Sequence, residues 1–153
     1  MQKKVNISKD FLTQRPEDPA FTRFALCVHP QTDVQKSLEA AKKSSALFLW
    51  GFADDQGVKA NKGRLGAAQG PRILRESFYK LPAPKNSENF KIFDLGDFSS
   101  NGKKLENLHQ EARKVLSLIH SKSFPSISFG GGHDWAAVDG DYEGVSVVHL
   151  DTH

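Results

Sequence analysis

Residues 46–52 read Ala-Leu-Phe-Leu-Trp-Gly-Phe, a run of apolar residues without a single charge. A short continuous run of this kind is typical of a strand that is buried on both faces, as in the middle of a parallel sheet. Further strands are predicted over residues 90–96, 124–129 and 144–151. The last of these also looks like an interior strand, which needs neighbours and covering helices to bury it.

The segments between these strands have helical patterns. After Asp33, a plausible N-cap, apolar residues recur at steps of three and four up to about residue 43. Gly70-Pro71 opens a second helix, because proline lacks an amide hydrogen that the first helical position does not use. An apolar stripe over residues 105–119 predicts a third. Alternating strands and helices predict an α/β fold, an open and mostly parallel sheet flanked by helices.

Composition limits the class of protein. The chain has 153 residues, enough for one domain, and its net charge of +3 is too small to suggest nucleic-acid binding. It has neither a secretory signal nor an apolar run of the roughly 18 residues that a membrane span needs. The single Cys27 agrees with a reducing cytoplasm. Residues 1–30 are predicted to be an N-terminal arm, and residues 31–153 to hold the sheet and helices.

Polar side chains follow the predicted strands at their carboxyl ends, where ligands gather in open α/β sheets. Residues 130–134 read Gly-Gly-Gly-His-Asp, and residues 151–153 read Asp-Thr-His. A spacing of two places Asp151 and His153 on one face of a strand. If a helix begins near His133, its dipole favours the neutral imidazole that a metal requires. Imidazole and carboxylate ligands without thiolate suit manganese, zinc or iron.

Each of these residues also has an ordinary structural interpretation. A glycine triplet before a histidine is often only a turn, and Asp-x-His near a chain end is often only polar. His149 shares a strand face with Asp151 and His153, and we interpret it as a packed histidine or one that supports a ligand. Cys27 is predicted to be buried or half-buried, and three histidines are predicted to be surface residues: His29, His109 and His120.

Together, the two motifs resemble the arginase/agmatinase/formimidoylglutamase family, the manganese ureohydrolases. That family has Gly-Gly-x-His-[Asp/Glu/Ser] after one strand and Asp-Ala-His-x-Asp after the next. Here the first motif corresponds to the glycine triplet with His133 and Asp134, and the second begins at residues 151–153. The resemblance implies an arginase-like three-layer fold. These residues supply three of the family's six metal ligands, so residues 31–153 are expected to be the N-terminal part of an incomplete domain.

The segment after the first strand favours one branch of the family. Residues 57–71 read Gly-Val-Lys-Ala-Asn-Lys-Gly-Arg-Leu-Gly-Ala-Ala-Gln-Gly-Pro. They resemble the Gly-Val-x-x-Asn-x-Gly-Arg-x-Gly-Ala-x-x-Gly-Pro stretch of formimidoylglutamases, which cleave N-formimidoyl-L-glutamate to glutamate and formamide in histidine breakdown. Arginases and agmatinases usually lack the Asn-x-Gly-Arg portion. An agmatinase- or arginase-type guanidino hydrolase and a non-catalytic remnant remain open as alternatives.

The resemblance also implies a site with two manganese ions. His133 would bind one ion, His153 the other, and Asp151 would bridge them. Hydroxide held between the ions would attack the imino carbon of the substrate. Asn61 and Arg64 would bind the substrate's carboxylates, since a guanidinium donates two parallel hydrogen bonds to a carboxylate. A contact of Arg64 with loop carbonyls is the alternative. No other catalytic residue is assigned, and a complete protein is expected to form homo-oligomers.

Overall fold

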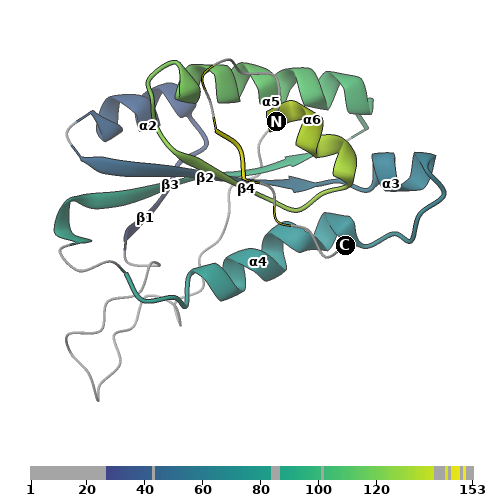
Figure 1. The fold of residues 1–153 in the computed structure, drawn as a ribbon, viewed down its shortest axis with the longest axis horizontal. Helices are drawn as coiled ribbons and strands as arrows, with labels where there is room; N and C mark the ends of the chain where they lie inside the picture. Colours follow the sequence, from purple (N-terminus) through teal and green to yellow (C-terminus); the bar gives the residue numbers. More distant parts are fainter. Residues whose placement is uncertain are drawn as a thin grey trace.

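The structure is a computed structural model that describes residues 27–42, 44–83, 87–100, 102–139, 144, 146–148 and 150. Its strands form one sheet in the order β1-β3-β2-β4, and every paired strand runs parallel to its neighbour. Their bounds are β1 (Val28–Pro30), β2 (Ser45–Ala53), β3 (Phe90–Ser99) and β4 (Ser126–Phe129). The predicted parallel α/β sheet is therefore confirmed (Figure 1).

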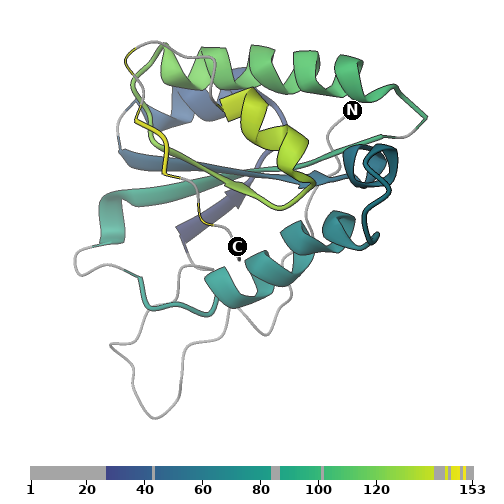
Figure 2. The same ribbon diagram turned by 45° about the vertical axis from the view of Figure 1, so that its right-hand side comes forward.

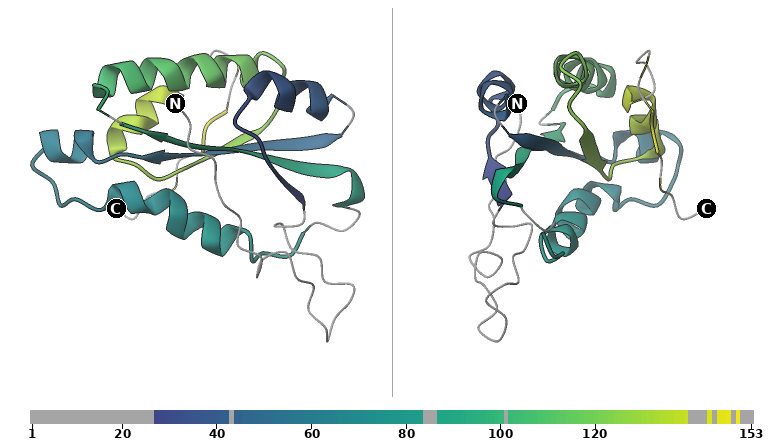
Figure 3. Two further views of the ribbon diagram at one scale, coloured as in Figure 1. Left: turned by 180° about the vertical axis from the view of Figure 1, so that it is seen from behind. Right: turned by 60° about the vertical axis from the view of Figure 1, so that its left-hand side comes forward.

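Helices cover both faces of the sheet and make a three-layer arrangement. On one face lie α2 (Val34–Ala41), α5 (Leu105–His120) and the short α6 (Ala136–Asp139), and on the other lies α4 (Gly70–Phe78) (Figures 1, 2 and 3). The remaining elements are α3 (Gln56–Ala60) and the 3-10 turns η2 (Ala67–Gln69), η3 (Ser87–Asn89) and η4 (His133–Trp135). In the described part of the chain, no helix combines the length and the apolar character that crossing a membrane requires.

The side chains of β2 alternate between two hydrophobic layers. Phe48, Trp50 and Phe52 belong to the layer that includes buried residues of α2 and α5. Leu49 belongs to the layer on the α4 face, together with Tyr79. Because β2 buries side chains on both faces, it is the central strand that its continuous apolar run predicted.

The predicted helix starts are confirmed. Asp33 is the N-cap of α2, and its carboxylate accepts a hydrogen bond of 3.2 Å from the Lys36 amide. Pro71 lies in the first turn of α4. By contrast, β1 was not predicted. Residues 28–30 belong to the segment assigned to the arm, yet they pair with Ile92–Asp94 of β3. The rest of that arm lies outside the described residues.

The strand predicted over residues 144–151 is wrong for the residues that the structure describes. Residues 146–148 are in no strand. The side chains of Val147, Val148 and Leu150 are 53%, 84% and 91% exposed. An apolar run becomes an interior strand only when other elements cover it, and no described element buries these side chains.

A buried network of ion pairs joins α4 to β3. The Arg75 guanidinium donates to both carboxylate oxygens of Asp94, at 2.8 and 3.0 Å, and also to Asp97. The Tyr79 hydroxyl donates to Asp94 as well, and its burial together with the negative charge of Asp94 raises the pKa of the Tyr79 phenol. A bulge sets four residues of β3, from Asp94 to Asp97, against three of β2, from Leu49 to Gly51. In a regular strand, residues three apart point to opposite faces, so it is the bulge that lets both carboxylates point to the same face.

The first turn of α4 touches the loop that follows β4. Gly130 has a φ of +69°, and a Cβ added there would lie 2.6 Å from Cδ and 2.9 Å from the nitrogen of Pro71. A Cβ on Gly70 would lie 3.3 Å from the Cα of Gly130. The structure thus brings the Gly-Pro helix start and the glycine triplet, which are sixty residues apart in sequence, into direct contact.

Replacing the buried arginine should destabilise the fold strongly. Arg75→Met leaves two carboxylates without their cation, and the side chain of Asp94 is 0% exposed. We expect the free energy of unfolding in urea to fall by about 3–5 kcal/mol. Arg72→Met is the matched control on the same helix, because its ion pair with Glu76 is 65% and 46% exposed and should contribute about 0.5 kcal/mol or less. Equal losses in the two variants would contradict this account of the network.

Gly130→Ala should destabilise the chain more than Gly102→Ala. Both residues have a positive φ, of +69° and +81°, so both variants should lose about 1 kcal/mol or more to backbone strain. Of these two positions, a Cβ at 130 would meet Pro71 within 4 Å, whereas a Cβ at 102 would meet no described atom. The overlap with Pro71 should add about 1–3 kcal/mol to the destabilisation by Gly130→Ala. Urea unfolding of both variants measures the difference, and identical midpoints would show that the contact with Pro71 relaxes at little cost.

Candidate functional site

The carboxyl ends of β2 and β4 are neighbours, since Gly51 pairs with Phe129. The segments that follow these strands, residues 54–66 and 130–135, therefore meet at one edge of the sheet. We call these two segments the site edge. This is the edge at which ligands bind in open α/β sheets.

Glycines 131 and 132 allow the second segment to fit against the first. Gly131 has a φ of +89°, and a Cβ there would lie 2.8 Å from the Cβ of Phe52. A Cβ on Gly132 would lie 3.0 Å from Cγ2 of Val58 in α3. Side chains at these two positions would therefore push the segment that carries His133 away from β2 and α3.

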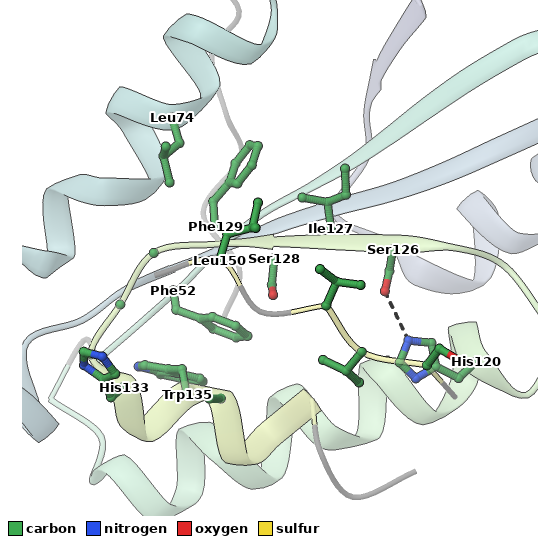
Figure 4. Close-up of a pocket in the computed structure, with 17 residues that line it drawn as sticks. Phe52, Leu74, His120, Ser126, Ile127, Ser128, Phe129, His133, Trp135 and Leu150 are labelled. Atoms are coloured by element: carbon green, nitrogen blue, oxygen red, sulfur yellow. Dashed lines mark hydrogen bonds between the residues drawn. The ribbon is translucent and has the colours of Figure 1, made fainter. Parts of the chain in front are cut away.

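His133 is exposed and begins η4, which continues directly into α6. The condition stated for His133, that a helix begins near it, is therefore met by a 3-10 turn. Figure 4 shows the His133 ring at the beginning of the turn that leads to Trp135. Trp135 stacks on Phe52 with ring centroids 4.0 Å apart and an interplanar angle of 15°, which anchors this turn to β2.

Asp134, the residue after His133, is bound to α5. His109 Nε2 donates to Asp134 Oδ2 at 3.0 Å, and the two side chains are 15% and 20% exposed. The His109 ring also packs edge-on against Trp135, with centroids 4.5 Å apart. The prediction that His109 is a surface residue is wrong. Its position four residues after Leu105 and three before Ala112 places it on the apolar face of the helix, a signal that the sequence does carry.

Two other histidines and the cysteine differ in how far they are exposed to solvent. His120 is partly buried, and its Nε2 lies 3.1 Å from the Ser126 hydroxyl, so the prediction of a surface position is wrong there too. His29 is exposed, as predicted. Cys27 is buried, as predicted, with 7% of its surface exposed.

Asn61 and Arg64 lie on the exposed stretch between α3 and η2. Asp55 links the two ends of this stretch, since its carboxylate accepts hydrogen bonds from the amides of Gly66, at 3.2 Å, and Ala68, at 3.0 Å. Within the described part of the chain Arg64 makes no hydrogen bond, so its guanidinium is not used to hold loop carbonyls there. The segment between β2 and α4, in which no helix was predicted, also contains α3.

A cavity of about 800 Å³ lies between β4 and residues 146–148 and 150. His133 and Trp135 line one end of it, and His120 with Ser126 the other (Figure 4). Most of the remaining lining is apolar. The cavity is the space beside β4 that the exposed apolar residues Val147, Val148 and Leu150 leave unfilled.

The predicted metal ligands are only partly placed. His133 is at the site edge, whereas Asp151 and His153 lie outside the described residues, as does His149. No group of three or more His, Cys, Asp and Glu side chains that could hold a metal ion is found among the described residues. The three-residue ligand set therefore stays a prediction.

Comparisons with known proteins agree with these motifs. Residues 45–153 match the family model described as "Arginase family". A formimidoylglutamase of Klebsiella pneumoniae (strain 342) is 33% identical over 114 residues, which cover 70% of this chain and 35% of that protein. A formimidoylglutamase of Lysinibacillus sphaericus (strain C3-41) is 33% identical over 130 residues, or 84% and 39% of the two chains.

A solved structure shows the same fold. The crystal structure of Trypanosoma cruzi formiminoglutamase with Mn²⁺ matches with a TM-score of 0.60 and 22% identity, over 78% of this chain and 39% of that one. The chain spans little more than a third of the length of the two curated relatives described above. Since the family model covers most of its residues, the chain belongs to the arginase family.

Proposed function

We propose that this chain carries part of the active site of a formimidoylglutamase-type hydrolase. The reaction cleaves the bond between the formimidoyl carbon and the glutamate nitrogen of N-formimidoyl-L-glutamate. Water adds its oxygen to the carbon, which leaves as formamide, and the nitrogen leaves as the amine of glutamate. Such a reaction belongs to histidine catabolism. The curated relatives of this name, together with the Asn-x-Gly-Arg stretch of residues 61–64, support the proposal.

The charge of the site edge favours this substrate over a cationic guanidine. Lys59, Lys62 and Arg64 are exposed on or just after α3. The nearby carboxylate of Asp55 is occupied by backbone amides of Gly66 and Ala68. The other two carboxylates of the site edge are engaged as well, Asp54 by the Gln56 amide and Asp134 by His109. The three exposed cations would therefore attract a substrate with two carboxylates and repel agmatine, which is positively charged at both ends. The exposure of these cations, beside carboxylates that already accept hydrogen bonds from the protein, is the observation that carries the proposal.

Asn61 and Arg64 would hold the carboxylates of the substrate. Both side chains are exposed on a stretch whose ends are fixed by α3 and by the hydrogen bonds of Asp55. The planar guanidinium of Arg64 suits a bidentate contact with a carboxylate. A substrate held at one end by these residues would present its amidine toward the neighbouring segment that begins η4.

His133, Asp151 and His153 would hold manganese at that segment. His133 fits this role because its imidazole is exposed at the carboxyl end of β4, beside the stretch that carries Arg64. Imidazole and carboxylate donors are ligands that manganese accepts. Bound manganese would supply Lewis acidity, which makes water a nucleophile near neutral pH. We further expect the complete enzyme to be cytoplasmic, since the buried Cys27 thiol suits a reducing compartment. We also expect the complete enzyme to form homo-oligomers.

The activity is testable in a chimera that joins these 153 residues to the C-terminal part of the Klebsiella pneumoniae relative. With Mn²⁺, the chimera should release formamide from N-formimidoyl-L-glutamate and leave arginine and agmatine intact. Hydrolysis of arginine or agmatine instead would assign a guanidino substrate. Folded chimera that hydrolyses none of the three would support a non-catalytic role.

Arg64→Ala in the same chimera should raise KM for formimidoylglutamate about 10- to 100-fold and change kcat less, because it removes a contact made equally in the ground and transition states. Lys36→Ala is the control, because its side chain on α2 is 75% exposed and pairs only with Asp33 among described residues. A fall in kcat with an unchanged KM would assign Arg64 a role other than binding the carboxylate.

His133→Ala should weaken Mn²⁺ binding by the chimera at least tenfold, since each lost ligand leaves more of the ion's charge without a partner. The signal of free Mn²⁺ in electron paramagnetic resonance measures this directly, without substrate. His29→Ala is the matched control, because His29 is an exposed histidine on β1. Unchanged affinity in His133→Ala would remove His133 from the proposed ligand set.

A further inference from the structure

Asp134 lies where three segments of the fold meet. A Cβ added to Gly57 would lie 2.1 Å from Asp134 Oδ1 and 2.4 Å from its Cγ, so the carboxylate rests directly on the buried backbone of α3. The same Oδ1 would lie 2.4 Å from a Cβ on Gly132. The other oxygen, Oδ2, accepts the hydrogen bond from His109. One side chain therefore contacts α3, the glycine triplet and α5.

His109 is held more firmly than the segments it connects. It belongs to a helix of 16 residues, in which Leu108, Ala112 and Leu116 are 0% exposed. Its ring also rests on Trp135, which in turn stacks on Phe52 of the central strand. The hydrogen bond to Asp134 thus ties the start of η4 to a well-packed helix.

By contrast, among the described residues α3 is held by side-chain hydrogen bonds only at its first residue, Gln56, which donates to Asp54 and to the Lys103 carbonyl. It has five residues, and its N-cap residue, Asp55, makes no side-chain hydrogen bond to the helix. Isolated helices of this length are unstable in water. Its buried residue is Gly57, which has no side chain and on which Asp134 packs. Beyond Gln56, the contact of Asp134 with Gly57 therefore helps to fix α3, and with it Asn61 immediately after the helix.

We propose, on the basis of the function proposed above, that His109 and Asp134 are positioning residues that fix the substrate-binding stretch relative to His133. Neither residue contacts the substrate in this arrangement. His109 holds Asp134 against Gly57, and Asp134 holds α3 at a set distance from the turn that His133 begins. Loss of the hydrogen bond would let the two segments of the site edge move independently, so that a substrate held by Arg64 meets the manganese-binding segment less often in the reactive position.

Hydrogen exchange in this 153-residue chain tests the coupling without any assay of activity. His109→Phe keeps a flat ring against Trp135 and removes the donor. Amides of α3 and the following turn, such as those of Asn61 and Gly63, whose acceptors lie within α3, should then exchange about tenfold faster, as expected for a hydrogen bond to a charged group. Amides of β2 and β3 should keep their rates. His109→Gln, whose side-chain amide can donate to Asp134, should restore protection.

Gly57→Ala is an independent variant that acts from the other side, since its methyl group would displace the Asp134 carboxylate. It should accelerate exchange in the same amides, and His29→Phe, at an exposed histidine on β1, should not. Unchanged exchange after α3 in both His109→Phe and Gly57→Ala would overturn the proposal. Equal acceleration in β2 and β3 would also overturn it, because the pair would then serve only the stability of the whole fold.

The chimera separates this proposal from the proposed function. There, His109→Phe should raise KM and lower kcat for formimidoylglutamate, with both recovered in His109→Gln and with Mn²⁺ affinity changed less than in His133→Ala. A wild-type chimera without hydrolase activity would contradict the proposed function, while the exchange experiment would still decide whether the two segments are coupled. Normal kinetics in His109→Phe would overturn the positioning role.

Discussion

The close approach of α4 to the loop after β4 is the constraint on which the site edge depends. Pro71 occupies the space that a side chain at residue 130 would need. Only glycine tolerates both this contact and the positive φ found there. Gly131 and Gly132 extend the same effect to β2 and α3, so the three glycines together let the start of η4 lie beside the segment that carries Asn61 and Arg64.

The position of α4 is itself fixed by charge as well as by packing. Arg75 reaches the one place in β3 where a bulge turns two carboxylates toward the same face. Such a pairing gives little net stability when compared with an apolar contact, but it penalises any helix position that leaves the carboxylates unpaired. The buried ion pairs therefore set where α4 begins, and so where Pro71 meets Gly130.

Sequence patterns predicted the structural features that depend on residues close together in the chain. The apolar run of residues 46–52 predicted a buried strand, because a run without charges favours burial on both faces. Asp33 and Pro71 marked helix starts, because a helix's first turn depends on the adjacent residues. In contrast, three residues of β1 are too few to show a pattern, and the polar segment of α3 has no apolar periodicity. The pairing of His109 with Asp134 spans 25 residues and arises only when α5 packs on the sheet. The strand predicted over residues 144–151 has the right local pattern, but its burial requires partners that the described residues do not supply.

The two tryptophans of the chain occupy different kinds of environment. Trp50 is wholly buried in the central strand, whereas Trp135 lies between Phe52 and His109 in the turn that begins with His133. Their indole emission therefore reports two separate events. Fluorescence from Trp50 follows the integrity of the whole fold, and fluorescence from Trp135 responds to rearrangements of the aromatic stack next to His133. A single Trp→Phe replacement at either position isolates the other signal, so the chain carries its own optical probe for each region.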